Sequence, residues 1–282
     1  MKKLIYLDNA ATTKTSEEVV AAMLPYFTEY YGNPSSVYEF ASESKKAVSN
    51  ARRTIAETLG AQENEIYFTA GGSEADNWAL KATAEAYQSK GKHIITTKIE
   101  HHAILHTAEY LEKRGFEITY IGVDENGVVK VDELEKAIRP DTILISVMFA
   151  NNEIGTIQPI KEIGEIAKKH GVLFHTDAVQ GFMKLPFRAS KLGADLISIS
   201  GHKIHAVKGI GALYIRQGLK LPAHILGGGQ EEGMRSGTEN VPGCAGLGLA
   251  AKMVYTDHDA KIDKLYAIKD RMVKGLQAMD GV

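Results

Sequence analysis

A single cysteine, Cys244, is present among the 282 residues of the chain. One thiol cannot form an internal disulfide framework, which argues against a disulfide-stabilised secreted domain. Long apolar runs are also missing, since no stretch approaches the ~18 apolar residues that a membrane span requires. The N-terminal apolar run ends at Asp8 and is too short for a signal peptide. We therefore expect a cytoplasmic protein that does not enter a membrane.

An excess of either charge is absent as well. Lys and Arg number 33 against 35 Asp and Glu, which gives a net charge of −2 at pH 7. The basic residues are scattered, whereas a nucleic-acid-binding protein usually carries a basic face or stripe. Apolar residues make up 44% of the chain, which is enough to bury a sizeable core. The length allows one large domain, or a large domain with part of a smaller one.

Segments typical of helices and of strands alternate along most of the chain. The expected helices cover residues 16–30, 40–59, 73–88, 102–114, 132–138 and 160–170. The expected strands cover residues 66–69, 93–97, 117–121, 143–149, 172–176, 196–200 and 212–215. Such alternation predicts an α/β fold around a mostly parallel sheet, with the last strand a candidate for the antiparallel direction. In such sheets, ligands bind at the carboxyl ends of the strands.

The pattern changes to a long helical stretch from about residue 244 to residue 276. We interpret the chain as an N-terminal segment (1–15), a large domain (16–245), and a helix leading into an incomplete smaller domain (246–282). Cys244 lies where this helical stretch begins, and we expect it to be a small buried apolar residue.

Two short segments have the residues of an anion site and of a cation partner. Gly71, Gly72 and Ser73 follow an expected strand and open a helix, so their backbone N–H groups suit a phosphate. The alternative is a tight turn with Ser73 as a helix N-cap. Asp177 ends another strand. It either caps the next turn or pairs with a cationic ring nitrogen.

Lys203 follows a strand directly, in Ser200–Lys203 (SGHK), where its amine could form a Schiff base. From local residues alone it is an ordinary lysine, and Lys208 competes with it. The histidines near 101 and 202 fit no zinc spacing, so no metal site is predicted, and a ring stacked on a flat cofactor suits one of them better. Residues 227–238 are too rich in glycine for a helix and predict a loop.

Taken together, these segments resemble the NifS/IscS-type cysteine desulfurases of the class V aminotransferase group, over nearly the whole chain. The segments that carry the resemblance are Tyr6–Thr13 (YLDNAATT), Gly32–Ser36 (GNPSS), Phe68–Ala75 (FTAGGSEA), Glu100–His102 (EHH), Asn151–Gly155 (NNEIG), His175–Gln180 (HTDAVQ), Ser200–Lys203 (SGHK), Gly227–Glu231 (GGGQE) and Arg235–Asn240 (RSGTEN). The resemblance implies a fold-type I enzyme that uses pyridoxal 5'-phosphate (PLP).

The family's residue roles then apply position by position. Lys203 resembles the lysine that binds PLP, so the resemblance assigns the Schiff base to Lys203 rather than to Lys208. Asp177 resembles the partner of the pyridinium nitrogen, and Gln180 the donor to the ring's phenolic oxygen. His101 resembles the histidine that stacks on the ring and takes part in proton transfer.

The remaining roles concern the phosphate, the substrate and a second subunit. Asn152 resembles a residue near the cofactor and the substrate carboxylate. Thr238 resembles a phosphate contact that reaches in from a partner subunit, which implies a homodimer. The residues that resemble phosphate contacts within the chain are Gly72, Ser73, Ser200 and His202.

The family's chemistry converts L-cysteine to L-alanine and leaves the sulfur as an enzyme persulfide. That sulfur then passes to an acceptor such as an iron–sulfur scaffold protein. The family's persulfide-forming cysteine, and the arginine that grips the substrate carboxylate, fall beyond residue 282, so we expect little sulfur transfer from this chain alone. We expect a truncated chain, and the alternatives are a naturally short paralogue and a missing part supplied by another polypeptide. The alternatives are a PLP-dependent lyase or aminotransferase that needs no enzyme thiol, and a non-catalytic dimer partner.

Two segments depart from the family pattern. The chain has Ala206–Gly209 (AVKG) where Gly-Pro-Lys-Gly is usual, which removes a proline that stiffens the loop. It also has Gly181–Lys184 (GFMK) where Ala-Val-Gly-Lys is common, which places Met183 at a glycine position. We expect neither change to touch a group that contacts PLP.

Overall fold

The computed structural model describes residues 5–281. The first four residues of the expected N-terminal segment, and the last residue of the expected C-terminal segment, lie outside this range. No helix between residues 5 and 281 is both long and apolar enough to cross a membrane.

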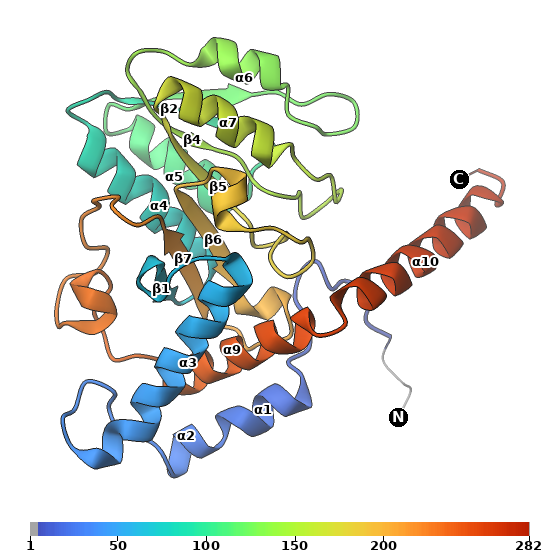
Figure 1. Ribbon diagram of the computed structural model, residues 1–282. Coiled ribbons are helices and arrows are strands. Elements are labelled where there is room, and N and C mark those ends of the chain that lie inside the picture. Colours follow the sequence, from blue (N-terminus) through green and yellow to red (C-terminus); the bar gives the residue numbers. More distant parts are fainter. Residues whose placement is uncertain (1–4, 282) are drawn as a thin grey trace.

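Seven strands form one sheet in the order β1-β7-β6-β5-β4-β2-β3 (Figure 1). Their bounds are β1 Ile66–Thr69, β2 His93–Thr97, β3 Glu117–Ile121, β4 Thr142–Ser146, β5 Leu173–Asp177, β6 Leu196–Ser200 and β7 Gly211–Ile215. The five strands from β2 to β6 pair in parallel, and β7 runs antiparallel to both of its neighbours. The expected mostly parallel α/β sheet is confirmed, as is the antiparallel direction of its last strand.

Helices connect the strands and cover both faces of the sheet (Figure 1). The α-helices are α1 Glu17–Met23, α2 Pro25–Thr28, α3 Ser42–Leu59, α4 Gly72–Tyr87, α5 His102–Glu112, α6 Val131–Ala137, α7 Ile160–His170, α8 Ala189–Leu192, α9 Val241–Tyr255 and α10 His258–Gln277. Short 3₁₀ turns are η1 Glu39–Ala41, η2 Glu63–Glu65, η3 Gly201–Lys203 and η4 Gln230–Gly233.

The sheet separates two apolar cores, because neighbouring residues of a strand point to opposite faces. Ile94 faces the core under α4 and α5, whereas Ile95 faces the core under α3, α7 and α9. Leu144 and Ile145 on β4 divide in the same way. Burial on both faces explains why these strands are continuous apolar runs in the sequence.

Three expectations about helices need correction. The expected helix 16–30 is two helices, because Pro25 has no N–H for a continuing helix and instead begins α2. The long C-terminal stretch is also two helices, separated at Thr256 and Asp257, where Asp257 has a φ of 55°. The N-cap of α4 is Gly71 rather than Ser73, and Ser73 lies inside the first turn.

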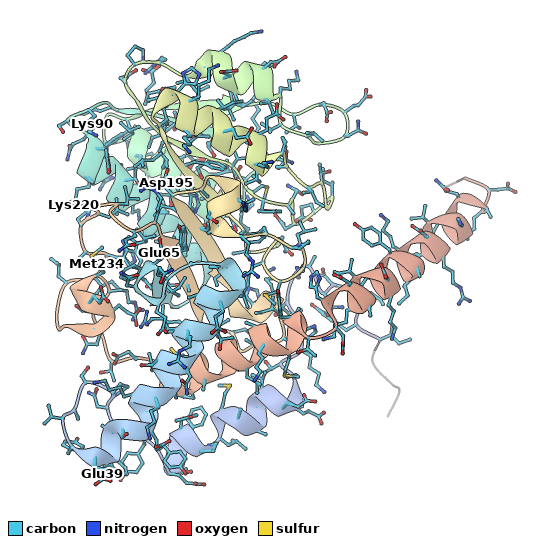
Figure 2. The ribbon with its side chains drawn as sticks, viewed as in Figure 1. Glu39, Glu65, Lys90, Asp195, Lys220 and Met234 are labelled. Atoms are coloured by element: carbon cyan, nitrogen blue, oxygen red, sulfur yellow. The ribbon has the colours of Figure 1, made fainter. Side chains whose placement is uncertain are left out.

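α10 extends away from the sheet domain, and its side chains stand apart from the other elements (Figure 2). None of its residues is buried against the rest of the described chain. The assignment of residues 246–282 to the start of a smaller domain stays a prediction.

Glu65, which is labelled in Figure 2, is buried and accepts hydrogen bonds from the N–H groups of Gln62 and Gln217.

The packing of α9 on α3 depends on a glycine. A Cβ added at Gly248 would lie 2.8 Å from the backbone Cα of Ala51, closer than real contacts allow. A Cβ at Gly275 on α10 would meet nothing within 4 Å. Alanine should therefore be poorly tolerated at position 248 and well tolerated at position 275.

We expect Gly248→Ala to destabilise the fold by about 1–3 kcal/mol, because α9 must move off α3. Gly275→Ala should leave the melting temperature unchanged or raise it, because alanine favours an exposed helix by about 0.5–1 kcal/mol. Thermal unfolding followed by circular dichroism measures both. Equal effects of the two substitutions would show that the helix contact does not constrain position 248.

Candidate active site

A cavity of about 780 Å³ opens at the carboxyl ends of the parallel strands, beside the start of α4. All but one of the predicted site residues line it: Gly72, Ser73, His101, Asn152, Asp177, Gln180, Ser200, His202 and Lys203. Thr238 is the exception and is exposed elsewhere on the chain. Segments more than 100 residues apart in the sequence thus meet at one site.

The N-terminus of α4 forms one end of the cavity. Its first N–H groups have no acceptor inside the helix, as at every helix start, and they attract negative charge. A Cβ at Gly72 would lie 2.6 Å from Cγ2 of Val179, so only glycine fits there. Ser200, which ends β6, lies close to Gly71 and is buried. This end of the cavity suits an anionic group such as a phosphate.

Asp177 ends β5 at the floor of the cavity and is only 5% exposed. Its Oδ1 accepts a hydrogen bond of 2.9 Å from the N–H of Val179. Burial raises the pKa of Asp177 above its usual value, while that hydrogen bond and the nearby His101 and Lys203 oppose the rise. A buried carboxylate of this kind gains most from a cationic partner inside the cavity.

Lys203 ends the η3 turn, and its amine points into the cavity toward the N-terminal segment. Its Nζ donates to the carbonyl oxygens of Ala10 and Ala11, the latter at 2.8 Å. Burial lowers the pKa of Lys203, partly opposed by carboxylates of which Asp177 has the largest effect. A lowered pKa increases the fraction of neutral, nucleophilic amine. Lys208 also lines the cavity, so geometry alone leaves both lysines available.

Gln180 is held from two sides. Its Nε2 donates to the carbonyl of Ala10 at 2.9 Å, and its Oε1 accepts from Nζ of Lys184 at 2.6 Å. Burial, followed by the charge of Lys203, lowers the pKa of Lys184 to about 8. No role for Lys184 was predicted from the sequence. By donating to Oε1 of Gln180, Lys184 fixes which end of the Gln180 amide presents hydrogen-bond donors.

Met183, just before Lys184, has a φ of 60°. That left-handed conformation favours glycine and costs a residue with a Cβ roughly 1–2 kcal/mol. The backbone here thus adopts a conformation that suits the glycine of the family pattern, while the Met183 side chain is buried in the core. Burial of that side chain offsets the backbone strain.

His101 caps the start of α5, where its Nδ1 accepts a hydrogen bond of 3.1 Å from the N–H of Ala103. The imidazole proton therefore lies on Nε2 when the ring is neutral. Asn152 lines the opposite wall, and its Nδ2 donates to Glu153 at 2.7 Å. Within residues 5–281, no three His, Cys, Asp or Glu side chains are grouped so that they could hold a metal ion.

The N-terminal segment crosses the site and is tied to His202. The carbonyl of His202 accepts hydrogen bonds from the N–H and the hydroxyl of Thr13, at 2.9 and 2.7 Å. Its Nδ1 lies 3.1 Å from the hydroxyl of Thr12. Burial, followed by three nearby lysines, lowers the pKa of His202, so its ring is mainly neutral at pH 7.

Two ion pairs fasten the glycine-rich loop that carries Thr238 to α3 and α4. Glu231 is buried, and its carboxylate accepts from Arg52 at 2.6 Å and from the N–H of Phe68 at 2.8 Å. Arg235 donates to both oxygens of Glu74, at 2.8 and 3.2 Å. The expected loop is confirmed except for the short η4 turn inside it.

Two buried acids beside the site were missed by the sequence analysis as site residues. Asp76 on α4 is 1% exposed and also lines the cavity. Glu100 is 6% exposed, and its Oε1 accepts from the hydroxyl of Thr97 at 2.7 Å and from the N–H of Met148 at 2.9 Å. One local signal could have indicated that Asp76 is buried. It is an acidic residue on a helix, next to Ala75 and Ala79, which face the core.

Burial raises the pKa of Glu100 from 4.5 to about 8. The folded chain therefore keeps a proton that the unfolded chain releases above pH 4.5. The stability that this proton contributes is complete below pH 4.5 and is lost as the pH rises toward 8. Glu100→Gln keeps the neutral form at every pH.

We expect Glu100→Gln to become more stable relative to the wild type as the pH rises from 5 to 8. The difference between the two free energies of unfolding should change by roughly 3 kcal/mol, and the melting temperatures should diverge accordingly. The other titrating groups are common to both proteins, so their contributions cancel in the difference. Thermal unfolding at several pH values measures it. Parallel curves for the two proteins would show that Glu100 is ionised in the folded chain.

The sequence and the structure of the chain are similar to those of known proteins, and these similarities show to which family it belongs. Residues 5–282 match the family model for aminotransferase class V. A cysteine desulfurase IscS from Methanosarcina thermophila is 57% identical over 97% of this chain and 68% of its own length. A solved structure titled NifS-like protein superposes with a TM-score of 0.95 at 42% identity, covering 98% of this chain and 76% of that one.

A second solved structure, titled SspA in complex with cysteine, superposes with a TM-score of 0.86 at 42% identity, covering 88% of this chain and 72% of that one. The chain thus spans between 68% and 76% of the length of these relatives. These similarities confirm the resemblance to NifS/IscS-type proteins and the fold-type I architecture. The chain belongs to the class V aminotransferase family and, within it, to the PLP-dependent cysteine desulfurases.

Proposed function

We propose that this cavity binds PLP on Lys203 and that the chain acts in the conversion of L-cysteine to L-alanine, with the sulfur passed on as a persulfide. The observation that carries the proposal is the convergence of three groups on one cavity. These are the amine of Lys203, the buried carboxylate of Asp177 and the anion-binding start of α4.

The residues present fit PLP at both ends of the molecule. The phosphate suits the N-terminus of α4, with the hydroxyls of Ser73 and Ser200 and the ring of His202 nearby. The glycine at position 72 leaves the backbone open to close approach, since any side chain there would meet Val179. At the other end, Asp177 offers a buried negative charge to a pyridinium nitrogen.

Bound PLP supplies an electron sink for bonds to the α-carbon of an amino acid. The chain's own residues supply the rest. Lys203, whose pKa is lowered by burial, can take up a proton and return it. His101 offers an Nε2–H at the cavity wall because its Nδ1 is used to cap α5. Gln180, oriented by Lys184, presents N–H donors to a ring oxygen.

Cysteine as the substrate is supported by the family and by the relative whose structure is titled as a complex with cysteine. Asn152 lies where its amide can contact the substrate carboxylate. The single cysteine, Cys244, is 1% exposed inside α9, and burial raises the pKa of its thiol. Cys244 therefore does not provide the thiolate that attacks the substrate sulfur.

The proposed partners follow from the same chemistry. A persulfide passes its sulfur to another thiol, and an iron–sulfur scaffold protein is the acceptor that we propose. Thr238 is exposed on a loop anchored by Glu231 and Arg235. This placement supports a homodimer in which Thr238 contacts the phosphate of the partner's site.

We expect the wild-type chain to develop the visible absorbance of lysine-bound PLP when the cofactor is added. Lys203→Ala should lose this absorbance completely. Lys208→Ala, which removes the competing amine of the same cavity, should retain it. If Lys208→Ala loses the absorbance and Lys203→Ala retains it, the cofactor is bound by Lys208 and the proposal is contradicted. If the wild type develops no absorbance, PLP binding is rejected.

With L-cysteine as substrate, we expect slow turnover to alanine. Dithiothreitol supplies the thiol that attacks the substrate sulfur, and it releases that sulfur as sulfide when it closes to its cyclic disulfide. Chromatography of the amino acids and an enzymatic pyruvate assay distinguish the alternatives. Pyruvate in place of alanine would identify a β-eliminating lyase. Bound PLP without any product would identify a non-catalytic partner.

A further inference from the structure

Three buried carboxyl groups lie at or beside the cavity, each less than 10% exposed: Asp76 and Asp177 line it, and Glu100 accepts a hydrogen bond from the N–H of Met148, which also lines it. They come from α4, from the turn after β2 and from the end of β5. Oδ1 of Asp76 and Oε2 of Glu100 have no hydrogen-bond partner among the described residues. The proposed chemistry assigns a task to Asp177 alone, so the other two acids need an explanation.

The positive charge available at this floor is small. His175, two residues before Asp177 on the same strand, lies with Nε2 3.7 Å from Oδ1 of Asp76. Its two ring nitrogens lie 2.9 Å from the hydroxyls of Ser146 and Ser198, and burial lowers the pKa of His175 to about 3. His175 is therefore neutral and cannot balance a buried carboxylate.

Asp76 lies beside His175, and Asp177 is two residues further along the same strand, so the side chains of His175 and Asp177 point to the same face of the sheet. Asp76 and Asp177 also line the same cavity. Two neighbouring buried carboxyl groups repel each other too strongly for both to be ionised. Asp177 has the N–H of Val179 as a hydrogen-bond donor and the side chains of Lys203 and His101 nearby. Asp76 has neither, so the negative charge of the pair belongs on Asp177.

We propose that Asp76 is a positioning residue that stays protonated and donates its proton in a hydrogen bond to the carboxylate of Asp177. The pair then holds one negative charge instead of two, and it holds that charge on Asp177. This inference rests on the proposed role of Asp177 toward a ring nitrogen. Burial and the charge of Asp177 raise the pKa of Asp76 well above its usual value, in agreement with the geometry.

A donated hydrogen bond also lowers the basicity of Asp177. The strength of the interaction of Asp177 with a ring nitrogen would thereby be set by Asp76. The groups that face the pair are Glu100, His175, Ser198, His101 and Lys203. Glu100 is itself protonated at pH 7, since burial raises its pKa to about 8, so it adds no second negative charge.

Infrared difference spectroscopy at pH 7 tests the proton on Asp76 directly, because a protonated carboxyl group has a carbonyl band that a carboxylate lacks. Glu100→Gln serves as the background, which removes the band of that acid. We expect the double variant Glu100→Gln/Asp76→Asn to lose one further carboxylic-acid band. Identical spectra of the single and double variants would overturn the proposal.

The effect on Asp177 is tested in the protein with PLP bound, by the pH dependence of the cofactor absorbance. Asp76→Asn keeps an N–H donor and should titrate like the wild type. Asp76→Leu removes the donor, which strengthens the charge on Asp177, and should move the midpoint to higher pH. A midpoint that shifts in Asp76→Asn and Asp76→Leu alike would show that Asp76 carries a charge and would contradict the proposal.

The two failures are distinguishable. If the wild type acquires no absorbance with PLP, the proposed function fails, while the infrared band still reports the state of Asp76. If PLP binds and the infrared band is absent, the inference about Asp76 fails and the proposed function stands.

Discussion

The position of Asp177 is the constraint on which the site depends. The residue ends a strand that is buried on both faces, so its carboxylate lies where water cannot compensate its charge. One hydrogen bond from the backbone of Val179 holds it in place. We propose that this carboxylate pairs with a cationic ring nitrogen in the cavity.

The parallel sheet brings the other groups to the same place. Because β5 and β6 run side by side in the same direction, Asp177 and the Ser200–Lys203 turn leave the sheet at one edge. The start of α4 lies at this edge as well, so a helix N-terminus that suits an anion and an acid line one cavity. A flat molecule with a phosphate and a ring nitrogen meets both requirements. The same arrangement supports the buried pair of acids, since α4 carries Asp76 down onto the floor beside β5.

Much of the fold could be predicted from the sequence, because apolar runs and helix ends are local signals. The strands agreed closely, and Gly60 and Gly171 end their helices in the left-handed conformation that glycine allows. The breaks at Pro25 and Asp257 were missed, since helical segments lie directly on both sides of each. Most of the predicted site residues line one cavity, whereas Lys184, Asp76 and Glu100 were not given roles. Their importance lies in burial and in contacts across the fold, which no local pattern reports.

The central claim is that the amine of Lys203 carries the cofactor. The most direct measurement is reductive trapping of PLP on the folded protein with borohydride, followed by peptide mass spectrometry. The account predicts a single pyridoxyl-modified peptide that contains Lys203. Modification of Lys208, or of scattered surface lysines without preference, would contradict it.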